Sequence, residues 1–127
     1  MPEAENTDAV KILAAADFKP KVLEAEKDVF VSFCHPLCKV CETVEKNMLK
    51  VAEPHDYPSV EFLAMDTSVN DPPGSYPVRT YPTLYLATPK NRTVPLKYVG
   101  KDFSLKEMRK FLDAHVSVPR TLAKTEL

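Results

Sequence analysis

An apolar run that leads directly into a cysteine-rich turn and a helical pattern constrains the fold most. Residues 29–34, Val-Phe-Val-Ser-Phe-Cys, are almost continuously apolar and rich in β-forming side chains. Continuous apolarity, without polar residues at alternate positions, predicts a central strand covered on both faces. From Cys38 the pattern becomes helical, with one apolar stripe formed by Val40, Val44, Met48 and Val51. We therefore expect a buried strand that turns into an amphipathic helix.

Four further strands are predicted from short apolar segments, at residues 10–13, 60–65, 83–87 and 94–99. Strand and helix alternate in the first half of the chain, which favours parallel pairing. A hairpin turn at Asn91-Arg92 is expected to join the last two strands. The predicted fold class is α/β, with a mixed five-stranded sheet sandwiched between helices.

Two more helices are predicted from capping residues and apolar faces. Asp17 can cap a helix that runs to about residue 26, with Pro20 in its first turn and Phe18, Val22 and Leu23 on its buried face. Ser104, with Glu107 three residues later, is a capping box. The final helix that this box opens has a core face formed by Leu105, Met108, Phe111 and Leu112.

Composition and length exclude several classes of protein. The 17 basic and 18 acidic side chains give a net charge of −1, and no basic stripe suggests nucleic-acid binding. The apolar runs are far too short to insert into a membrane. A length of 127 residues favours one domain. We place it at residues 9–116, after a flexible lead-in at 1–8 and before a tail at 117–127.

All three cysteines are close together in the sequence, at positions 34, 38 and 41. Such clustering indicates a local site rather than a disulfide framework. Cys38 and Cys41 form C-x-x-C beside a βαβ pattern, which is typical of a thioredoxin-like redox motif. The helix N-terminus favours a thiolate on Cys38, and the ammonium of Lys39 adds a positive charge beside it. Cys41, one turn later, could attack a mixed disulfide formed by Cys38.

Cys34 leaves two interpretations open. The spacing C-x3-C-x2-C also occurs in iron–sulfur sites, but a cluster or a zinc ion needs further ligands. His35 is the only histidine nearby in the sequence, so we expect no metal and no cofactor. Cys34 is then either a small hydrophobic residue packed in the strand or a third redox thiol that competes with Cys41 for Cys38.

Several segments resemble protein disulfide isomerases. Residues 28–41 resemble the strand and active-site segment of that family, and Met65-Asp66 with residues 76–83 resemble its second signature. Tyr98-Val99-Gly100 also fits. The resemblance covers about residues 8–115, and the best match is the C-terminal catalytic domain of a multidomain isomerase, usually called a′. It implies a thioredoxin fold and thiol–disulfide oxidoreductase or isomerase activity on protein clients.

The resemblance also implies roles for individual residues. Cys38 corresponds to the exposed attacking cysteine and Cys41 to the buried resolving one. Pro82, which follows the aromatic Tyr81 at the mouth of a strand, corresponds to a cis-proline that faces the cysteines. The backbone at Tyr81 is expected to pair with an extended client chain. Lys101 corresponds to a basic residue that assists the resolving cysteine.

The last four residues suggest a location. Lys124-Thr125-Glu126-Leu127 is similar to the endoplasmic-reticulum retrieval signal, with Thr in place of the usual Asp. Together with the resemblance, it predicts residence in the endoplasmic-reticulum lumen and a retrieval receptor as a partner. Because residue 1 is not followed by a secretory signal, we expect the natural protein to carry further chain upstream, including other isomerase domains.

Three departures from the family pattern modify this prediction. Leu37 stands where the family usually has Trp, and Lys39-Val40 where it usually has Gly-His. Without that His, we expect a less oxidising disulfide than in a standard isomerase domain. Ser32 stands where a buried carboxylate usually moves the proton of the resolving cysteine, so mixed disulfides should be released slowly. A second function therefore stays open: a client-binding module with weak catalysis.

Overall fold

A central strand, β2 (Asp28–Cys34), organises the sheet in the computed structural model, which describes residues 9–91 and 94–119. The five strands lie in the order β1-β3-β2-β4-β5. The other strands are β1 (Val10–Ile12), β3 (Val60–Asp66), β4 (Thr83–Ala87) and β5 (Leu96–Lys97). β1 and β2 both pair parallel with β3, whereas β4 pairs antiparallel with β2 and β5. The predicted mixed sheet is therefore confirmed.

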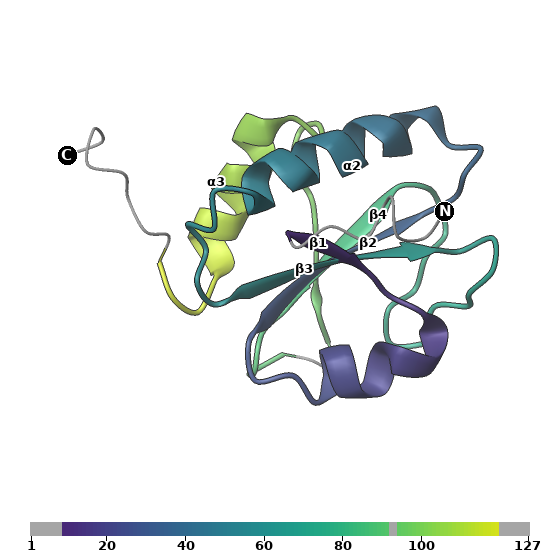
Figure 1. The fold of residues 1–127 in the computed structure, drawn as a ribbon, viewed down its shortest axis with the longest axis horizontal. Coiled ribbons are helices and arrows are strands. Elements are labelled where there is room, and N and C mark those ends of the chain that lie inside the picture. Colours follow the sequence, from purple (N-terminus) through teal and green to yellow (C-terminus); the bar gives the residue numbers. More distant parts are fainter. Residues whose placement is uncertain (1–8, 92–93, 120–127) are drawn as a thin grey trace.

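Helical segments cover both faces of this sheet (Figure 1). α2 (Lys39–Ala52) and α3 (Leu105–His115) pack on one face, and the 3₁₀ turn η1 (Ala15–Asp17) and the π-helix η2 (Lys19–Leu23) lie on the other. The predicted cap of α3 is confirmed, because the Ser104 hydroxyl accepts a hydrogen bond from the Glu107 N–H at 3.2 Å. The Glu107 carboxylate instead accepts from the Lys101 N–H, so only half of the capping box forms.

Each face of β2 contributes to its own apolar core. Phe30 packs toward α2 and α3 with Val44 and Met48. Val29, Val31 and Phe33 pack toward η2, against a second cluster that contains Leu13, Val22 and Tyr76. All seven residues of β2 are buried, as continuous apolarity predicted. Because side chains alternate along a strand, Ser32 and Cys34 share the α2 side with Phe30.

Two helical predictions were wrong in detail. Asp17 does not cap a helix: it is the last residue of η1, and the N-cap of η2 is Phe18, whose side chain makes no cap hydrogen bond. Phe18 precedes η2 instead, and its ring is anchored edge-on against Tyr76, with centroids 4.8 Å apart. Val40 is 50% exposed, so it does not belong to the buried stripe of α2. That stripe begins with Cys41 and continues through Val44, Met48 and Val51.

In the second half of the chain, β4 agrees with the predicted strand and β5 is shorter than predicted. β4 has the predicted bounds, whereas β5 has two residues rather than the six of the predicted strand. Of the predicted turn, Asn91 accepts hydrogen bonds from Thr88, and Arg92 lies outside the described residues. Within residues 9–91 and 94–119, the helices are too short or too polar to cross a bilayer.

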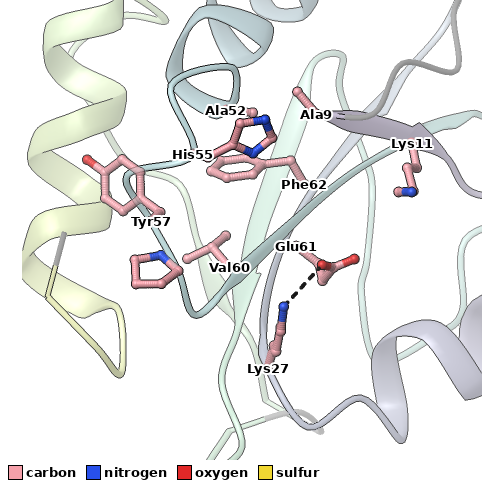
Figure 2. A pocket seen from close by; sticks show the side chains of 10 residues that line it. Ala9, Lys11, Lys27, Ala52, His55, Tyr57, Val60, Glu61 and Phe62 are labelled. Carbon is pink, nitrogen blue, oxygen red and sulfur yellow. Dashed lines mark ion pairs between the residues drawn. The ribbon is translucent and has the colours of Figure 1, made fainter. Parts of the chain in front are cut away.

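A shallow hollow of about 160 Å³ lies at the edge of the sheet where β2 and β3 begin. Figure 2 shows its lining by Val60, Glu61 and Phe62 of β3 and by residues that follow α2, among them His55. Lys27 pairs with Glu61 across its rim at 3.7 Å. Since Cys34 is the last residue of β2, the hollow and the cysteines lie at opposite ends of the central strands.

Candidate active site at the cysteine cluster

The end of β2 and the start of α2 bring the three cysteines together. Cys34 is the last residue of β2, and Cys38 is the N-cap of α2, in the extended conformation typical of that position. The Cys38 Sγ accepts a hydrogen bond from the Cys41 N–H at 3.3 Å. Cys41 lies in the first turn of α2 and points inward, because it begins the buried stripe of that helix. The predicted placement of Cys38 and Cys41 at the start of a helix is confirmed.

The pairing of the cysteines differs from the prediction. Cys34 and Cys41 form a disulfide with their Cα atoms 5.9 Å apart, a separation typical of disulfides. Both residues are nearly inaccessible, at 6% and 3% exposed, and Cys38 is a partly exposed free thiol. Cys34 is therefore more than a packed hydrophobic residue. The physical reason is that Cys34 and Cys41 face each other between strand and helix, whereas Cys38 caps the helix end.

Hydrogen bonds fix the backbone on both sides of the cluster. The Cys34 carbonyl accepts from the Thr67 N–H at 2.9 Å and from the Thr67 hydroxyl at 3.0 Å. The His35 carbonyl accepts from the Cys38 N–H at 2.9 Å, and His35 Nδ1 accepts from the Leu37 N–H at 3.1 Å. The turn that joins Cys34 to Cys38 is therefore held by its own first residue and by the segment after β3.

Tyr81-Pro82 adjoins this turn, and its peptide bond is cis, as the resemblance to isomerases implied. The Tyr81 ring lies 5.7 Å from the His35 ring, measured between centroids. The Thr83 hydroxyl donates to the Thr80 carbonyl at 2.6 Å, which fixes the chain around Pro82 at the start of β4. Sequence reasoning assigned His35 no role in the site, because a contact with a residue 46 positions away leaves no local signal.

Exposed apolar side chains lie close to the free thiol in sequence or adjoin its turn. Leu37, directly before Cys38, is 86% exposed, and Tyr81 is 43% exposed. Val40, in the first turn of α2, is half exposed as well. Exposed apolar side chains that gather at one place often mark a surface that contacts another molecule. We call Leu37, Val40 and Tyr81 the apolar rim.

The charged and polar residues expected to assist the cysteines are less closely placed. Lys39 is exposed in the first turn of α2, next to Cys38. Lys101 is exposed in the loop before α3. Hydrogen bonds from Ser104 are the main reason that the pKa of Asp102 is lowered, and the charge of Lys101 lowers it further. No described contact joins Lys101 to a cysteine, so its role stays a prediction. Ser32 is fully buried, and its Oγ has no hydrogen-bond partner among the described residues.

The C-x3-C-x2-C spacing is also compatible with a metal site. In the part of the chain that the structure describes, no three His, Cys, Asp or Glu side chains are grouped so that they could hold a metal ion. Of the three cysteines, two are bonded to each other. A disulfide and a free thiol thus lie side by side in the cluster, which is the set of groups that thiol–disulfide exchange requires.

A comparison with protein families identifies the domain. The family model described as thioredoxin matches residues 9–114. The chain belongs to the thioredoxin family. Among solved structures, this thioredoxin-family domain is similar to chloroplastic thioredoxin z, with a TM-score of 0.69 and 16% identity over 85% of this chain and 95% of that one. It is also similar to the J-Trx1 fragment of ERdj5, with a TM-score of 0.70 and 21% identity over 85% of this chain and 50% of that one.

Curated relatives over most of the chain are protein disulfide isomerases. Protein disulfide-isomerase A3 of Gallus gallus is 35% identical over 78% of this chain and 20% of its own length. A probable protein disulfide-isomerase A4 of Caenorhabditis elegans is 31% identical over 84% of this chain and 17% of its own length. This thioredoxin-family domain is thus a distant homologue of that family. It spans about a fifth of the length of the curated relatives it matches.

Proposed function

We propose that this thioredoxin-family domain is a thiol–disulfide oxidoreductase or isomerase that acts on protein clients. The observation that carries the proposal is the free, partly exposed Cys38 thiol at the N-cap of α2, with its Sγ against the Cys41 N–H. An anionic sulfur is the better acceptor for that N–H, and unpaired N–H groups at a helix start favour an anion. Cys38 is therefore the attacking residue.

The exchange uses Cys38 and Cys41 in sequence when the cysteines are reduced. The Cys38 thiolate attacks one sulfur of a client disulfide, so that a mixed disulfide forms and the other client sulfur leaves as a thiolate. Cys41 then attacks the Cys38 Sγ, forms the Cys38–Cys41 bond and releases the client with both sulfurs reduced. Two electrons pass from the domain to the client.

Client binding is proposed at the apolar rim and at the backbone of Tyr81-Pro82. The rim lies beside Cys38 in sequence at Leu37 and Val40, and Tyr81 joins it through its contact with His35. An extended client chain could pair with the backbone at Tyr81, which would read backbone rather than sequence. Unfolded proteins, which expose apolar side chains and extended segments, fit both features.

Insulin reduction tests the proposed activity. Wild type should reduce insulin in the presence of a thiol donor, and Cys38→Ser should not, since the attacking sulfur is lost. Cys41→Ser should accumulate mixed disulfides. Lys90→Ala is a matched control, because Lys90 is exposed beyond the end of β4 that lies opposite the cysteines. Equal rates for wild type and Cys38→Ser would refute the proposed activity.

We further propose that the domain is more reducing than a standard isomerase domain and slow to release clients. Lys39-Val40 supplies no imidazole beside Cys38, and Ser32 supplies no carboxylate on the α2 side of β2. Equilibration with glutathione measures the first property. A potential as high as about −180 mV, typical of protein disulfide isomerase, would contradict it. Ser32→Glu should speed the decay of mixed disulfides, and an unchanged decay rate would refute that explanation.

A client-binding module with weak catalysis is the second candidate. It is favoured by the Cys34–Cys41 disulfide, because a bonded Cys41 cannot resolve a client held on Cys38. Gel analysis after quenching with N-ethylmaleimide separates the two candidates. Clients that stay covalently attached without turning over indicate a binding module, whereas transient adducts with multiple turnovers indicate an enzyme.

Location and neighbours remain part of the proposal. The Lys124–Leu127 signal lies outside the described residues. The relatives are longer isomerases, and we propose that the domain works within such a protein, in the a′-type position. We propose the endoplasmic-reticulum lumen as its compartment and a retrieval receptor as a partner. Removing residues 124–127 from the full natural protein should cause its secretion, which immunoblotting of culture medium measures. Complete retention without these residues would contradict retrieval through them.

A further inference from the structure

We propose that Cys34 is a third redox residue, whose bond to Cys41 keeps Cys38 free in the oxidised domain. In that state the domain rearranges client disulfides without a net change in redox state. This inference rests on the proposed function, because it requires Cys38 to attack clients. It goes beyond the usual two-cysteine cycle, in which the oxidised form has no free thiol at the site.

Geometry makes Cys41 the partner of both other cysteines. The Cys34 and Cys41 Cα atoms are 5.9 Å apart, and the bond joins their sulfurs. On the other side, the Cys41 N–H is shared between the Cys38 Sγ at 3.3 Å and the Cys38 carbonyl at 3.2 Å. Cys38 is thus held against the first turn of α2 without being bonded to it.

Burial separates the roles of the three sulfurs. Cys34 and Cys41 are buried, so a client disulfide cannot readily reach either of them. Cys38 is partly exposed and lies next to the apolar rim. Thr67 fixes the Cys34 backbone through two hydrogen bonds to its carbonyl, which keeps Cys34 in bonding range of Cys41. The Cys34–Cys41 bond is therefore shielded from clients, and the Cys38 thiol stays available to attack them.

The internal step is a balanced thiol–disulfide exchange. After client reduction, the Cys38–Cys41 bond holds the oxidising equivalents. The Cys34 thiol loses its proton to solvent, and its sulfur attacks the Cys41 Sγ. The Cys34–Cys41 bond forms, the Cys38–Cys41 bond breaks, and the electron pair leaves with Cys38 as a thiolate. The client disulfide has already acted as the oxidant, so no other one is needed.

The freed Cys38 can then attack a second client disulfide. Its mixed disulfide is not resolved by Cys41, whose sulfur is already bonded to Cys34. The displaced client thiolate attacks a second disulfide of the same client, which releases a different client thiolate. That thiolate attacks the client sulfur of the mixed disulfide. A new client disulfide forms, Cys38 leaves as a thiolate, and no electrons are transferred overall. Oxidation thus converts the domain from a reductant of clients into a disulfide isomerase.

Peptide mapping of the wild-type protein tests the pairing directly. The folded domain is oxidised with one equivalent of diamide, blocked with N-ethylmaleimide, denatured and digested with trypsin. Cleavage after Lys27, Lys39 and Lys46 separates residues 28–39 from residues 40–46. Either pairing links these two peptides, and fragmentation shows which cysteine of 28–39 carries the maleimide. We expect it on Cys38; maleimide on Cys34, or no linked peptides, would overturn the proposal.

Activity in the oxidised state provides the second arm. Oxidised wild type should reactivate scrambled ribonuclease without added thiol. Oxidised Cys34→Ala should lack this activity, because the only disulfide it can form is Cys38–Cys41, which leaves no free thiol to attack the client. Circular dichroism establishes that Cys34→Ala is folded, and oxidised Cys38→Ser is the inactive control. If oxidised wild type fails here while reduced wild type reduces insulin, only this inference is refuted. If reduced wild type also fails with insulin, the proposed function is refuted.

Discussion

The Cys34–Cys41 disulfide should stabilise the fold by an amount that follows from the length of chain it closes. The two cysteines are separated by 7 positions. In the chain-entropy description, closing a loop of that length lowers the conformational entropy of the unfolded state, which stabilises the fold by about 2.4 kcal/mol at 25 °C. A bond between Cys38 and Cys41, which are three positions apart, would stabilise the fold by only about 1.6 kcal/mol.

Two variants isolate these bonds. Cys38→Ser can form only Cys34–Cys41, and Cys34→Ser can form only Cys38–Cys41. Each variant is unfolded by urea in its oxidised and reduced states, so that the effect of the substitution itself cancels. Oxidised Cys38→Ser should have a urea midpoint roughly 1 M higher than its reduced form, from the usual dependence of unfolding free energy on urea. Oxidation should raise the midpoint of Cys34→Ser less.

The result that refutes this reasoning is a reversed order. If oxidation stabilised Cys34→Ser more than Cys38→Ser, the longer loop would not be the favoured one. Absence of any redox-dependent shift in Cys38→Ser, with the disulfide verified by mass, would also contradict it. The double variant Cys34→Ser with Cys41→Ser, which keeps only Cys38 and can form no internal disulfide, controls for effects of the reductant on the rest of the fold.

Three further predictions concern buried polar groups. Asp28→Ala should lower the unfolding free energy by about 2–3 kcal/mol in urea, because the buried carboxylate accepts hydrogen bonds from Ser117 and Ser59; an unchanged midpoint would contradict this. Ser32→Ala should raise the unfolding free energy by about 1 kcal/mol, since the buried Oγ has no partner among the described residues and its removal relieves a desolvation penalty; a loss of stability would reveal a bond. Burial of the Tyr98 hydroxyl raises its pKa from 10.0 to about 12, and the negative charges of Glu107 and Asp102 add to this shift. The hydroxyl therefore stays protonated to a higher pH in the folded state than in the unfolded state. Its contribution to stability is complete below pH 10 and lost as the pH rises toward 12; Tyr98→Phe should flatten that slope in urea titrations.

Patterns confined to one element predicted most of the fold. Continuous apolarity placed β2 at the centre, and the spacing of Ser104 and Glu107 located the start of α3. Val40 was misassigned because an apolar residue at the correct helical spacing can still lie at the exposed helix end. Asp17 was misassigned because the packing of Phe18, a tertiary contact, determines where η2 begins.

The site was only partly accessible to such patterns. Cys38 and Cys41 follow from a local motif, and the cis bond before Pro82 follows from the resemblance to isomerases. The bond between Cys34 and Cys41 depends on which side chains face each other between two elements. One signal was present: Cys41, Val44 and Met48 also have helical spacing. Starting the stripe at Cys41 would have turned that residue inward, toward the side of β2 that carries Cys34.

The hydrogen bonds between Asp28 and Ser117 also tie the segment after α3 to the start of β2. Asp28 begins the strand that Cys34 ends, so Ser117 is anchored roughly 20 Å from the cysteines at the rise of an extended strand. A surface attachment or a pulling handle placed just after Pro119 would leave the cysteine edge accessible. Tension applied there would act first on the bonds to the Asp28 carboxylate and only afterwards on α3. The exchange chemistry and the mechanical anchor thus occupy the two ends of one strand.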